Sequence, residues 1–386
     1  MSSLDKFAAD KLAALEAANR RRTLAETVRE EGIWLSRDGR RMISFSCNDY
    51  LNLTHHPKVK AAAIAAIEKY GTGAGASRLV TGNHPLLTEL ELRLAKLKGT
   101  EAACVFGSGY LANAGIIPTL TGEGDLLLLD ELSHSCIWAG AQLSRARMFA
   151  FRHNNVAHAR SLLEQHRAGH RHALIVTDGV FSMDGDLAPL HDLSALAAKH
   201  DAWLMSDDAH GLGVIGDGRG SAFADGTKAR IDLQMGTLSK AVGSYGGYLC
   251  GSQAAIDLIK TRARTLVYST GLPPASAAAA IAALDVIQAE PALAARALNN
   301  AQTFTRLLNL PTAQSPIVPI VLGEETLALE AQQILEKQDF LVAAIRPPTV
   351  PPGTARLRFA FTAGHPEAEI ARLAETVRER VMPLVP

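Results

Sequence analysis

From residue 202 the chain reads Ala202-Trp203-Leu204-Met205-Ser206-Asp207-Asp208-Ala209-His210, an apolar run that ends in two acids and an imidazole. The next apolar run, Ile231 to Gly236, is followed by Thr237-Leu238-Ser239-Lys240. Short apolar runs that end in polar turns are typical of buried strands, and open α/β sheets carry their binding sites beyond the carboxyl ends of such strands. The two segments therefore predict an α/β fold with an acid, an imidazole and a primary amine in one site.

The same alternation of short apolar runs with longer helical patterns fills the middle of the chain. The other runs are Ala102 to Phe106, Leu126 to Asp130, Met148 to Phe151 and Ala173 to Asp178, and an alanine-rich helical stretch follows at Pro274 to Gln288. Strands that alternate with helices predict a mostly parallel sheet with helices on both faces.

The C-terminal part has a different order of elements. We expect a strand at Ile317 to Leu322, a helix at Glu325 to Lys337, strands at Phe340 to Ile345 and Leu357 to Phe361, and a helix at Pro366 to Val381. This order predicts a compact α+β unit.

The N-terminal part is expected to join that unit. The first 22 residues keep apolar side chains at helical spacing, which predicts an amphipathic helix, and short strand-like runs follow at Ile33 to Ser36 and Met42 to Ser46. We expect residues 1–45 to pack with the small domain, residues 46–288 to form the large domain that carries the site, and residues 289–386 to form the small domain.

Composition excludes several classes of function. The 386 residues include 39 basic and 39 acidic ones, so no net charge favours nucleic acid or an anionic membrane. The longest apolar stretch, Ala275 to Leu284, is roughly half of what a bilayer span requires. The four cysteines lie far apart without Cys-x-x-Cys spacing, which supports neither a disulfide framework nor a metal site. We expect a cytoplasmic protein that acts on small molecules.

Together, Asp207, His210 and Lys240 are the groups that a pyridoxal 5'-phosphate (PLP) enzyme needs. A carboxylate keeps the pyridine nitrogen protonated, which makes the ring an electron sink, and a lysine holds the aldehyde as a Schiff base. His210 is placed to reach the phenolic oxygen of the ring or the substrate carboxylate. Each residue alone has an ordinary explanation, as a helix cap, a loop histidine or a surface lysine. The prediction therefore depends on the three together.

A phosphate site is predicted at Phe106-Gly107-Ser108-Gly109-Tyr110-Leu111-Ala112. The run follows a strand and opens a helix, whose free N–H groups and dipole bind phosphate, and Thr237 and Ser239 offer hydroxyl donors. The same run satisfies G-x-G-x-x-A, a dinucleotide fingerprint, with Asp130 about twenty residues further on. A nicotinamide oxidoreductase is therefore the alternative, although it leaves the acid, the imidazole and the amine without a shared role.

Two more polar residues follow strand ends. His134, after the Leu126 to Asp130 run, is placed to stack its ring on a cofactor, and its ordinary role is that of a polar loop residue. Ser182, after the Ala173 to Asp178 run, is placed to bond the phenolic oxygen, and its ordinary role is that of a turn serine.

Five motifs give the chain a family resemblance that extends nearly end to end. They are Ser46-Cys47-Asn48-Asp49-Tyr50-Leu51, Asp184-Gly185-Asp186, Asp207-Asp208-Ala209-His210-Gly211, Thr237-Leu238-Ser239-Lys240 and Tyr268-Ser269-Thr270. With them the chain resembles the α-oxoamine synthases, fold-type I PLP transferases that condense an amino acid with an acyl-CoA. Within the family, Ala344 to Arg358 is most similar to the members that use L-alanine and a pimeloyl thioester. Sister enzymes that use glycine or serine remain alternatives, as does a non-catalytic partner subunit, although the latter would not need Lys240.

The resemblance implies a role for each matching residue. It implies Lys240 as the Schiff-base lysine, Asp207 on the pyridine nitrogen, His134 stacked on the ring, Ser182 and His210 at the phenolic oxygen, and Gly109, Tyr110 and Thr237 near the phosphate. It also implies a homodimer with shared sites, in which Ser269 or Thr270 reaches the phosphate of the neighbouring subunit. Arg346 is expected to bind the substrate carboxylate, because a guanidinium fork matches a carboxylate. Arg20, Asn48 and Thr349 are expected at substrate positions, with Arg21 as the alternative register for Arg20.

Overall fold

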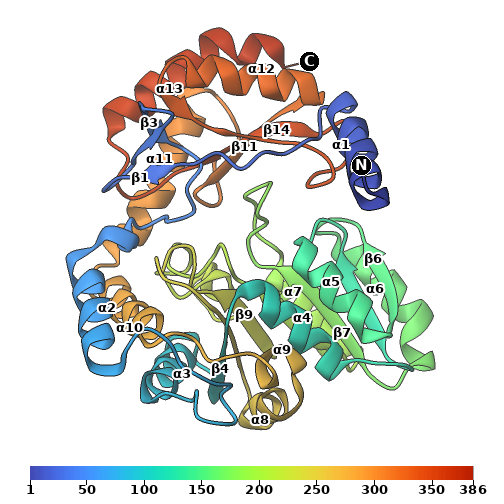
Figure 1. Cartoon of the computed structure of the whole chain (residues 1–386). Helices are drawn as coiled ribbons and strands as arrows, with labels where there is room; N and C mark the ends of the chain where they lie inside the picture. The colour runs from blue at the N-terminus through green and yellow to red at the C-terminus, as the bar shows by residue number, and fades with distance from the viewer. Residues whose placement is uncertain (386) are drawn as a thin grey trace.

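A seven-stranded sheet forms the centre of the larger lobe in the computed structural model, which describes residues 1–385 (Figure 1). Its strands lie in the order β4-β10-β9-β8-β7-β5-β6. Their bounds are β4 Ala102–Phe106, β5 Leu126–Asp130, β6 Arg147–Phe151, β7 Ala173–Asp178, β8 Trp203–Asp207, β9 Leu233–Thr237 and β10 Gly247–Gly251. Only β10 runs antiparallel to its neighbours. The predicted mostly parallel sheet is confirmed, but the sequence pattern missed β10, because its short apolar run lies between glycines.

Helices cover both faces of this sheet. One face packs against α4 (Gly109–Leu120), α5 (Ser135–Ser144), α8 (Gln253–Arg262) and α9 (Arg264–Val267). The other packs against α2 (Pro57–Tyr70), α3 (Pro85–Lys98), α6 (Val156–His166), α7 (Leu190–Lys199) and α10 (Pro274–Ala289). In β5, Leu127 and Leu129 face the first group of helices and Leu126 and Leu128 face the second. Burial on both faces explains why the parallel strands have continuous apolar runs rather than alternating ones.

The smaller lobe contains two further sheets. The first has the order β11-β14-β13 and the second the order β1-β2-β3-β12. The strands are β1 Val28–Arg29, β2 Trp34–Arg37, β3 Arg40–Ser44, β11 Ile317–Gly323, β12 Phe340–Leu341, β13 Ala343–Ile345 and β14 Ala355–Ala360, and the helices are α11 Ala292–Leu307, α12 Glu325–Glu336 and α13 Glu367–Arg380. Short 3₁₀ turns lie at Leu53–His55, Arg167–Gly169, Ser221–Phe223 and Met382–Leu384.

One predicted strand of the smaller lobe is two strands in the structure. The run Phe340 to Ile345 divides at the buried Val342, where β12 pairs with β3 in one sheet and β13 pairs with β14 in the other. The chain changes sheets at this point, which a continuous apolar pattern does not reveal. A buried apolar cluster joins residues of β2 and β3 to the C-terminal elements. The predicted domain boundaries at 45/46 and 288/289 stay a prediction.

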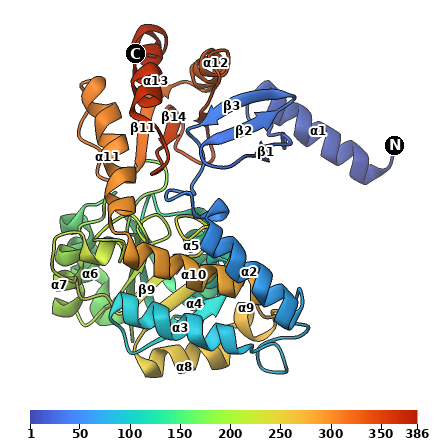
Figure 2. The same cartoon turned by 90° about the vertical axis from the view of Figure 1, so that its left-hand side faces the viewer.

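The N-terminal helix differs from its prediction. The helix α1 (Ser3–Ala17) ends five residues before Arg22, has no buried residue and projects from the smaller lobe (Figure 2). The expected packing of this helix on the small domain is therefore wrong for α1 itself. Its apolar side chains, such as Phe7, are exposed, and the residues after the helix make the contact instead: Arg20 bonds Glu325 of α12 at 3.0 Å.

Within residues 1–385, no single helix is long and apolar enough to cross a membrane, and only the pair α10 and α11, bent by 78°, reaches the required length together. All four cysteines are free thiols, and three of them are buried. The cytoplasmic location stays a prediction.

Candidate active site

The carboxyl ends of the parallel strands meet at the edge of the sheet that faces the smaller lobe, and Lys240 lies there in the loop after β9. Its Nζ atom donates a hydrogen bond of 2.7 Å to Nε2 of His210. The other ring nitrogen, Nδ1, lies 2.7 Å from the hydroxyl of Tyr50, which in turn donates to Asn48 at 3.2 Å. A neutral imidazole has one acceptor and one donor nitrogen, so this chain of bonds requires His210 to donate from Nδ1. The sequence predicted Lys240 and His210, and the structure brings them together.

Burial keeps both groups from being fully charged. It lowers the pKa of His210 well below its usual value, and the nearby charges of Lys240 and Arg358 lower it further. It also lowers the pKa of Lys240 from 10.5 to about 8, an effect that Asp207 opposes and Arg358 reinforces. About a tenth of Lys240 is therefore neutral amine at pH 7, far more than for an ordinary lysine, and the neutral amine is the form that attacks carbonyl groups.

Asp207 ends β8 as an almost fully buried carboxylate with two donors. Asn113 of α4 donates to Oδ2 at 2.7 Å, and the backbone N–H of Ala209 donates to Oδ1 at 3.0 Å. The amide of Asn113 also reaches the Sγ atom of Cys136 at 3.1 Å. Sequence analysis missed Asn113, and its only signal is a polar residue within an apolar helix.

His134 is the N-cap of α5. Its backbone N–H donates to Oδ2 of Asp178 at 2.9 Å, and its Nδ1 lies 2.8 Å from Sγ of Cys136. Burial lowers the pKa of His134, so the ring favours its neutral form. Burial and the neighbouring Asp207 raise the pKa of Asp178 well above its usual value.

The start of α4 offers an anion site. Among residues 1–385, no hydrogen-bond acceptor faces the backbone N–H groups of Gly109 and Tyr110. Thr237 lies beside them, since a Cβ atom added to Gly109 would be 3.5 Å from that of Thr237. The Thr237 and Ser239 hydroxyls are 2.8 Å apart. Two free N–H groups at a helix N-terminus and two hydroxyls match the requirements of a phosphate.

Arg358 of β14 extends from the smaller lobe into the site. It is 5% exposed and bonds the carbonyl of Ser182, the side chain of Asn48 at 3.1 Å and the hydroxyl of Tyr50 at 3.4 Å. None of these partners is a carboxylate, and no residue in the described chain forms a salt bridge with it. A buried, unneutralised guanidinium is costly unless an anion binds it. Sequence analysis missed Arg358, whose signal is a charge inside an apolar strand.

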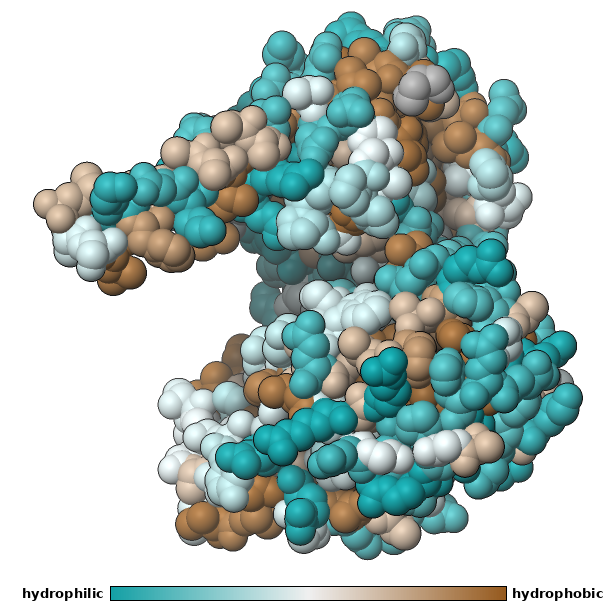
Figure 3. Space-filling model, turned by 90° about the vertical axis from the view of Figure 1, so that its right-hand side faces the viewer, coloured by the Kyte–Doolittle hydropathy of each residue, from teal (hydrophilic) through white to brown (hydrophobic). Residues whose placement is uncertain are grey.

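A cavity of about 580 Å³ between the lobes brings other predicted residues together. Arg20, His134, Ser182 and Thr349 all line it. Figure 3 shows the hollow between the lobes from the outside. Arg346 does not line this cavity and instead bonds the carbonyl of Asn19, away from Lys240.

Ser269 and Thr270 lie apart from the anion site. Thr270 forms an isolated bridge with Ser77 on the surface, and neither residue bonds Gly109 or Thr237 of the same chain.

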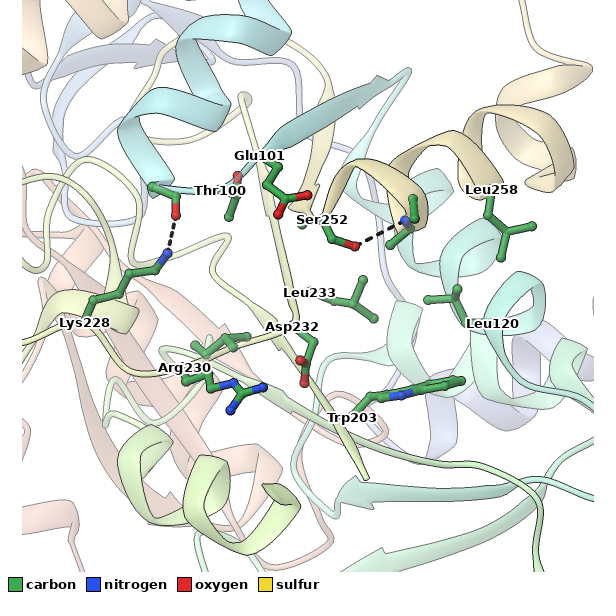
Figure 4. A pocket seen from close by; sticks show the side chains of 15 residues that line it. Thr100, Glu101, Leu120, Trp203, Lys228, Arg230, Asp232, Leu233, Ser252 and Leu258 are labelled. Carbon is green, nitrogen blue, oxygen red and sulfur yellow. Dashed lines mark hydrogen bonds between the residues drawn. The ribbon is translucent and has the colours of Figure 1, made fainter. Parts of the chain in front are cut away.

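A second cavity, of about 700 Å³, lies at the opposite edge of the sheet (Figure 4). Its wall includes Trp203 and Leu233, which begin β8 and β9, and Lys228, which bonds the carbonyl of Gly99. None of the predicted site residues lines it.

Residues 40–377 match the model of the family described as aminotransferase class I and II. The chain belongs to this family. The family membership confirms the predicted fold-type I architecture, in agreement with the two-lobed fold and its mostly parallel sheet. The family membership also overturns the nicotinamide alternative. Asp130, which a dinucleotide fold would place on the ribose, is buried and bonded to His153 at 3.1 Å.

Three relatives show which members of the aminotransferase class I and II family this chain is similar to. A protein of Beijerinckia indica named 8-amino-7-oxononanoate synthase is 64% identical over 100% of this chain and 99% of its own length. The serine palmitoyltransferase of S. paucimobilis, solved with a bound PLP–myriocin aldimine, has a TM-score of 0.92 at 30% identity and covers 100% of this chain and 99% of its own. The 8-amino-7-oxononanoate synthase of Francisella tularensis has a TM-score of 0.76 at 27% identity, covering 89% of this chain and 98% of its own.

Proposed function

We propose that this protein condenses L-alanine with a pimeloyl thioester, pimeloyl-CoA or its carrier-protein form, to give 8-amino-7-oxononanoate, carbon dioxide and the free thiol in biotin biosynthesis. The single observation that carries the proposal is 64% identity over the whole chain to a protein of that name. The serine palmitoyltransferase likeness, at 30% identity, supports the shared cofactor and fold rather than the same substrates.

The residues of the site fit PLP. Lys240 is placed to hold its aldehyde carbon, and the free N–H groups of Gly109 and Tyr110 with the hydroxyl of Thr237 are placed to hold its phosphate. Asp207, fixed by Asn113, is the carboxylate for a pyridine nitrogen. When bound, PLP supplies a protonated ring that accepts an electron pair from the carbon next to the substrate amine. His134 and Ser182 are the proposed contacts to the ring and its phenolic oxygen.

Lys240 is the proposed proton carrier. Its lowered pKa of about 8 allows it to remove the α-proton of alanine as a neutral amine and later to return a proton to the same carbon. Nε2 of His210 accepts a hydrogen bond from the Lys240 amine and holds the amine toward the site. The condensation joins the α-carbon of alanine to the thioester carbonyl, breaks the C–S bond and releases the alanine carboxylate as carbon dioxide.

Arg358 is the proposed partner of the alanine carboxylate, in place of the predicted Arg346. It is buried, lacks an anionic partner in the described chain and lies within the Lys240 cluster, whereas Arg346 bonds a backbone carbonyl outside it. Asn48 orients the guanidinium, which is a positioning role rather than the predicted contact. Arg20 and Thr349, on the cavity wall, remain the proposed acyl-side residues, although Glu325 already neutralises Arg20.

We also propose a homodimer with shared sites. Tyr268 is 77% exposed, Val80 is 74% exposed and Leu79 is 65% exposed, and they lie next to the Ser77–Thr270 bridge. Contiguous exposed apolar side chains mark interaction surfaces. A partner seated there would receive Ser269 or Thr270 at its own phosphate site.

The test offers the purified holoenzyme alanine, glycine or serine with pimeloyl-CoA, acetyl-CoA, succinyl-CoA or palmitoyl-CoA, and measures the release of free thiol. The expected result is the largest kcat/KM for alanine with pimeloyl-CoA. A preference for glycine with a short acyl-CoA, or for serine with palmitoyl-CoA, would reject the substrate assignment and keep the cofactor chemistry.

A further inference from the structure

A partly buried cluster beside the site has no part in the chemistry above. His153, in the connection between β6 and α6, bonds a carboxylate with each ring nitrogen: Nδ1 lies 3.1 Å from Asp130 and Nε2 lies 2.8 Å from Asp186. A ring that donates from both nitrogens is an imidazolium. Burial alone lowers the pKa of His153, but its two carboxylate partners outweigh burial and raise the pKa to about 10. The ring is therefore a cation throughout the neutral pH range.

One end of this cluster anchors the loop of His134. Asp130, which is fully buried at the end of β5, accepts the backbone N–H of Leu132 at 2.9 Å through its side chain and that of Ser133 at 3.1 Å through its carbonyl. His134 follows directly. A rotation of the Asp130 carboxylate would therefore displace the start of α5.

The other end closes the turn of Ser182. The carbonyl of Asp186 accepts the N–H of Phe181 at 3.0 Å, so the two residues bracket Ser182. The ring of His153 packs edge-on against that of Phe181 with 4.3 Å between centroids. The cation thus contacts both sides of the turn.

The neighbouring Asn154 repeats the connection. Its backbone N–H donates to Asp130 at 2.8 Å, and its side-chain amide donates to Asp186 at 2.9 Å. Two successive residues that join the same two carboxylates indicate a fixed bridge rather than a chance contact.

We propose that the His153 side chain is a positioning residue that holds the loop of His134 and the turn of Ser182 at a fixed separation. The proposal rests on the proposed function in one respect, namely that these two residues contact the cofactor. It does not depend on which amino acid or thioester the enzyme uses.

The test replaces the cation in the holoenzyme. His153→Asn removes the charge and leaves a side chain too short to span both carboxylates. We expect hydrogen exchange to become about tenfold faster in residues 131–136 and in residues 181–187 together, since charge-assisted bonds are lost at both ends. The visible circular dichroism of bound PLP should change as well. His191→Asn, at an exposed histidine of α7 whose nearest carboxylate is 3.8 Å away, should alter neither signal.

Kinetics give the second part of the test. In His153→Asn we expect kcat to fall about tenfold, with each KM changed less than about twofold. Faster exchange in neither or only one segment, or an unchanged kcat, would overturn the proposal. If that variant does not fold, Asp186→Asn, at a side chain that is 30% exposed, replaces it. This variant weakens the bridge at one end only, so we expect faster exchange in residues 181–187 and the same fall in kcat, and an unchanged kcat would overturn the proposal. Because exchange and dichroism do not depend on the substrate, their failure is distinguishable from a wrong substrate assignment.

Discussion

The amine of Lys240 and the imidazole of His210 form a buried pair, 2.7 Å apart, in which only the lysine donates. The ring cannot take up a proton easily, because burial lowers its pKa and its other nitrogen is occupied by Tyr50. The proton that leaves Lys240 must therefore go to solvent or to substrate rather than to His210. This arrangement makes the lysine the group whose protonation controls the site.

The first prediction concerns pH. Below pH 8 Lys240 is mostly an ammonium ion, and the fraction of neutral amine rises as the pH increases through its pKa of about 8. The rate at which added PLP reconstitutes cofactor-free protein should rise about tenfold per pH unit below pH 8 and level off above it. Stopped-flow absorbance measures this rate. A profile that continues to rise toward 10.5, the ordinary lysine value, would contradict the lowered pKa.

The second prediction concerns the lysine itself. Lys240→Ala should abolish both the visible absorbance of the PLP Schiff base, measured without added amine, and the release of thiol, because no other amine of the described chain lies in this cluster. Lys199→Ala, at the exposed end of α7, is the control and should keep both. Retention of either property by Lys240→Ala would require another lysine at the site.

The third prediction separates two arginines. Arg358→Gln should raise the KM for the amino acid by at least about thirtyfold, because the substrate carboxylate would lose its buried guanidinium partner. The KM for the thioester should change much less. Arg346→Gln should change the amino-acid KM less than about threefold, because its guanidinium bonds the carbonyl of Asn19. The opposite ranking would restore the assignment made from the sequence.

The strand ends of the larger lobe illustrate what can be predicted from the sequence. The strand ends at Asp207 and Thr237 were predictable, because continuous apolar runs and polar turns define buried parallel strands locally. Lys240 and His210, on two such ends, follow from the rule that these ends share one edge of the sheet. The family resemblance added roles that local pattern does not contain.

The contribution of the smaller lobe was not predictable in the same way. Arg346 and Arg358 are both cations near one proline-rich segment, and only the path of β13 and β14 decides which one enters the site. The apolar periodicity of α1 predicts that one face of the helix packs on the small domain, but none of its residues is buried. Periodicity does not show whether another element lies against that face. Asn113 and Tyr50 were missed because their partners are distant in sequence.

The last prediction concerns stability beneath the site. Lys98 is fully buried and donates to Asp208 at 2.6 Å and to the carbonyl of Arg219 at 2.7 Å. Asp208 also accepts the N–H of Ser221 at 3.0 Å, so the pair fixes the loop that follows the site. Removing one partner leaves an uncompensated buried charge, and Lys98→Met should lower the free energy of unfolding by about 3–5 kcal/mol.

Lys96→Met, two residues earlier and exposed on the same helix, is the matched control and should change the free energy of unfolding by less than about 0.5 kcal/mol. Urea unfolding followed by far-UV circular dichroism measures both variants. The double variant Lys98→Met with Asp208→Asn should recover part of the loss, because no charge is then left unpaired. If Lys98→Met and Lys96→Met lowered the free energy of unfolding equally, the buried Lys98–Asp208 pair would not stabilise the fold more than an exposed lysine does. The order of the loop at Ser221 would then need another cause.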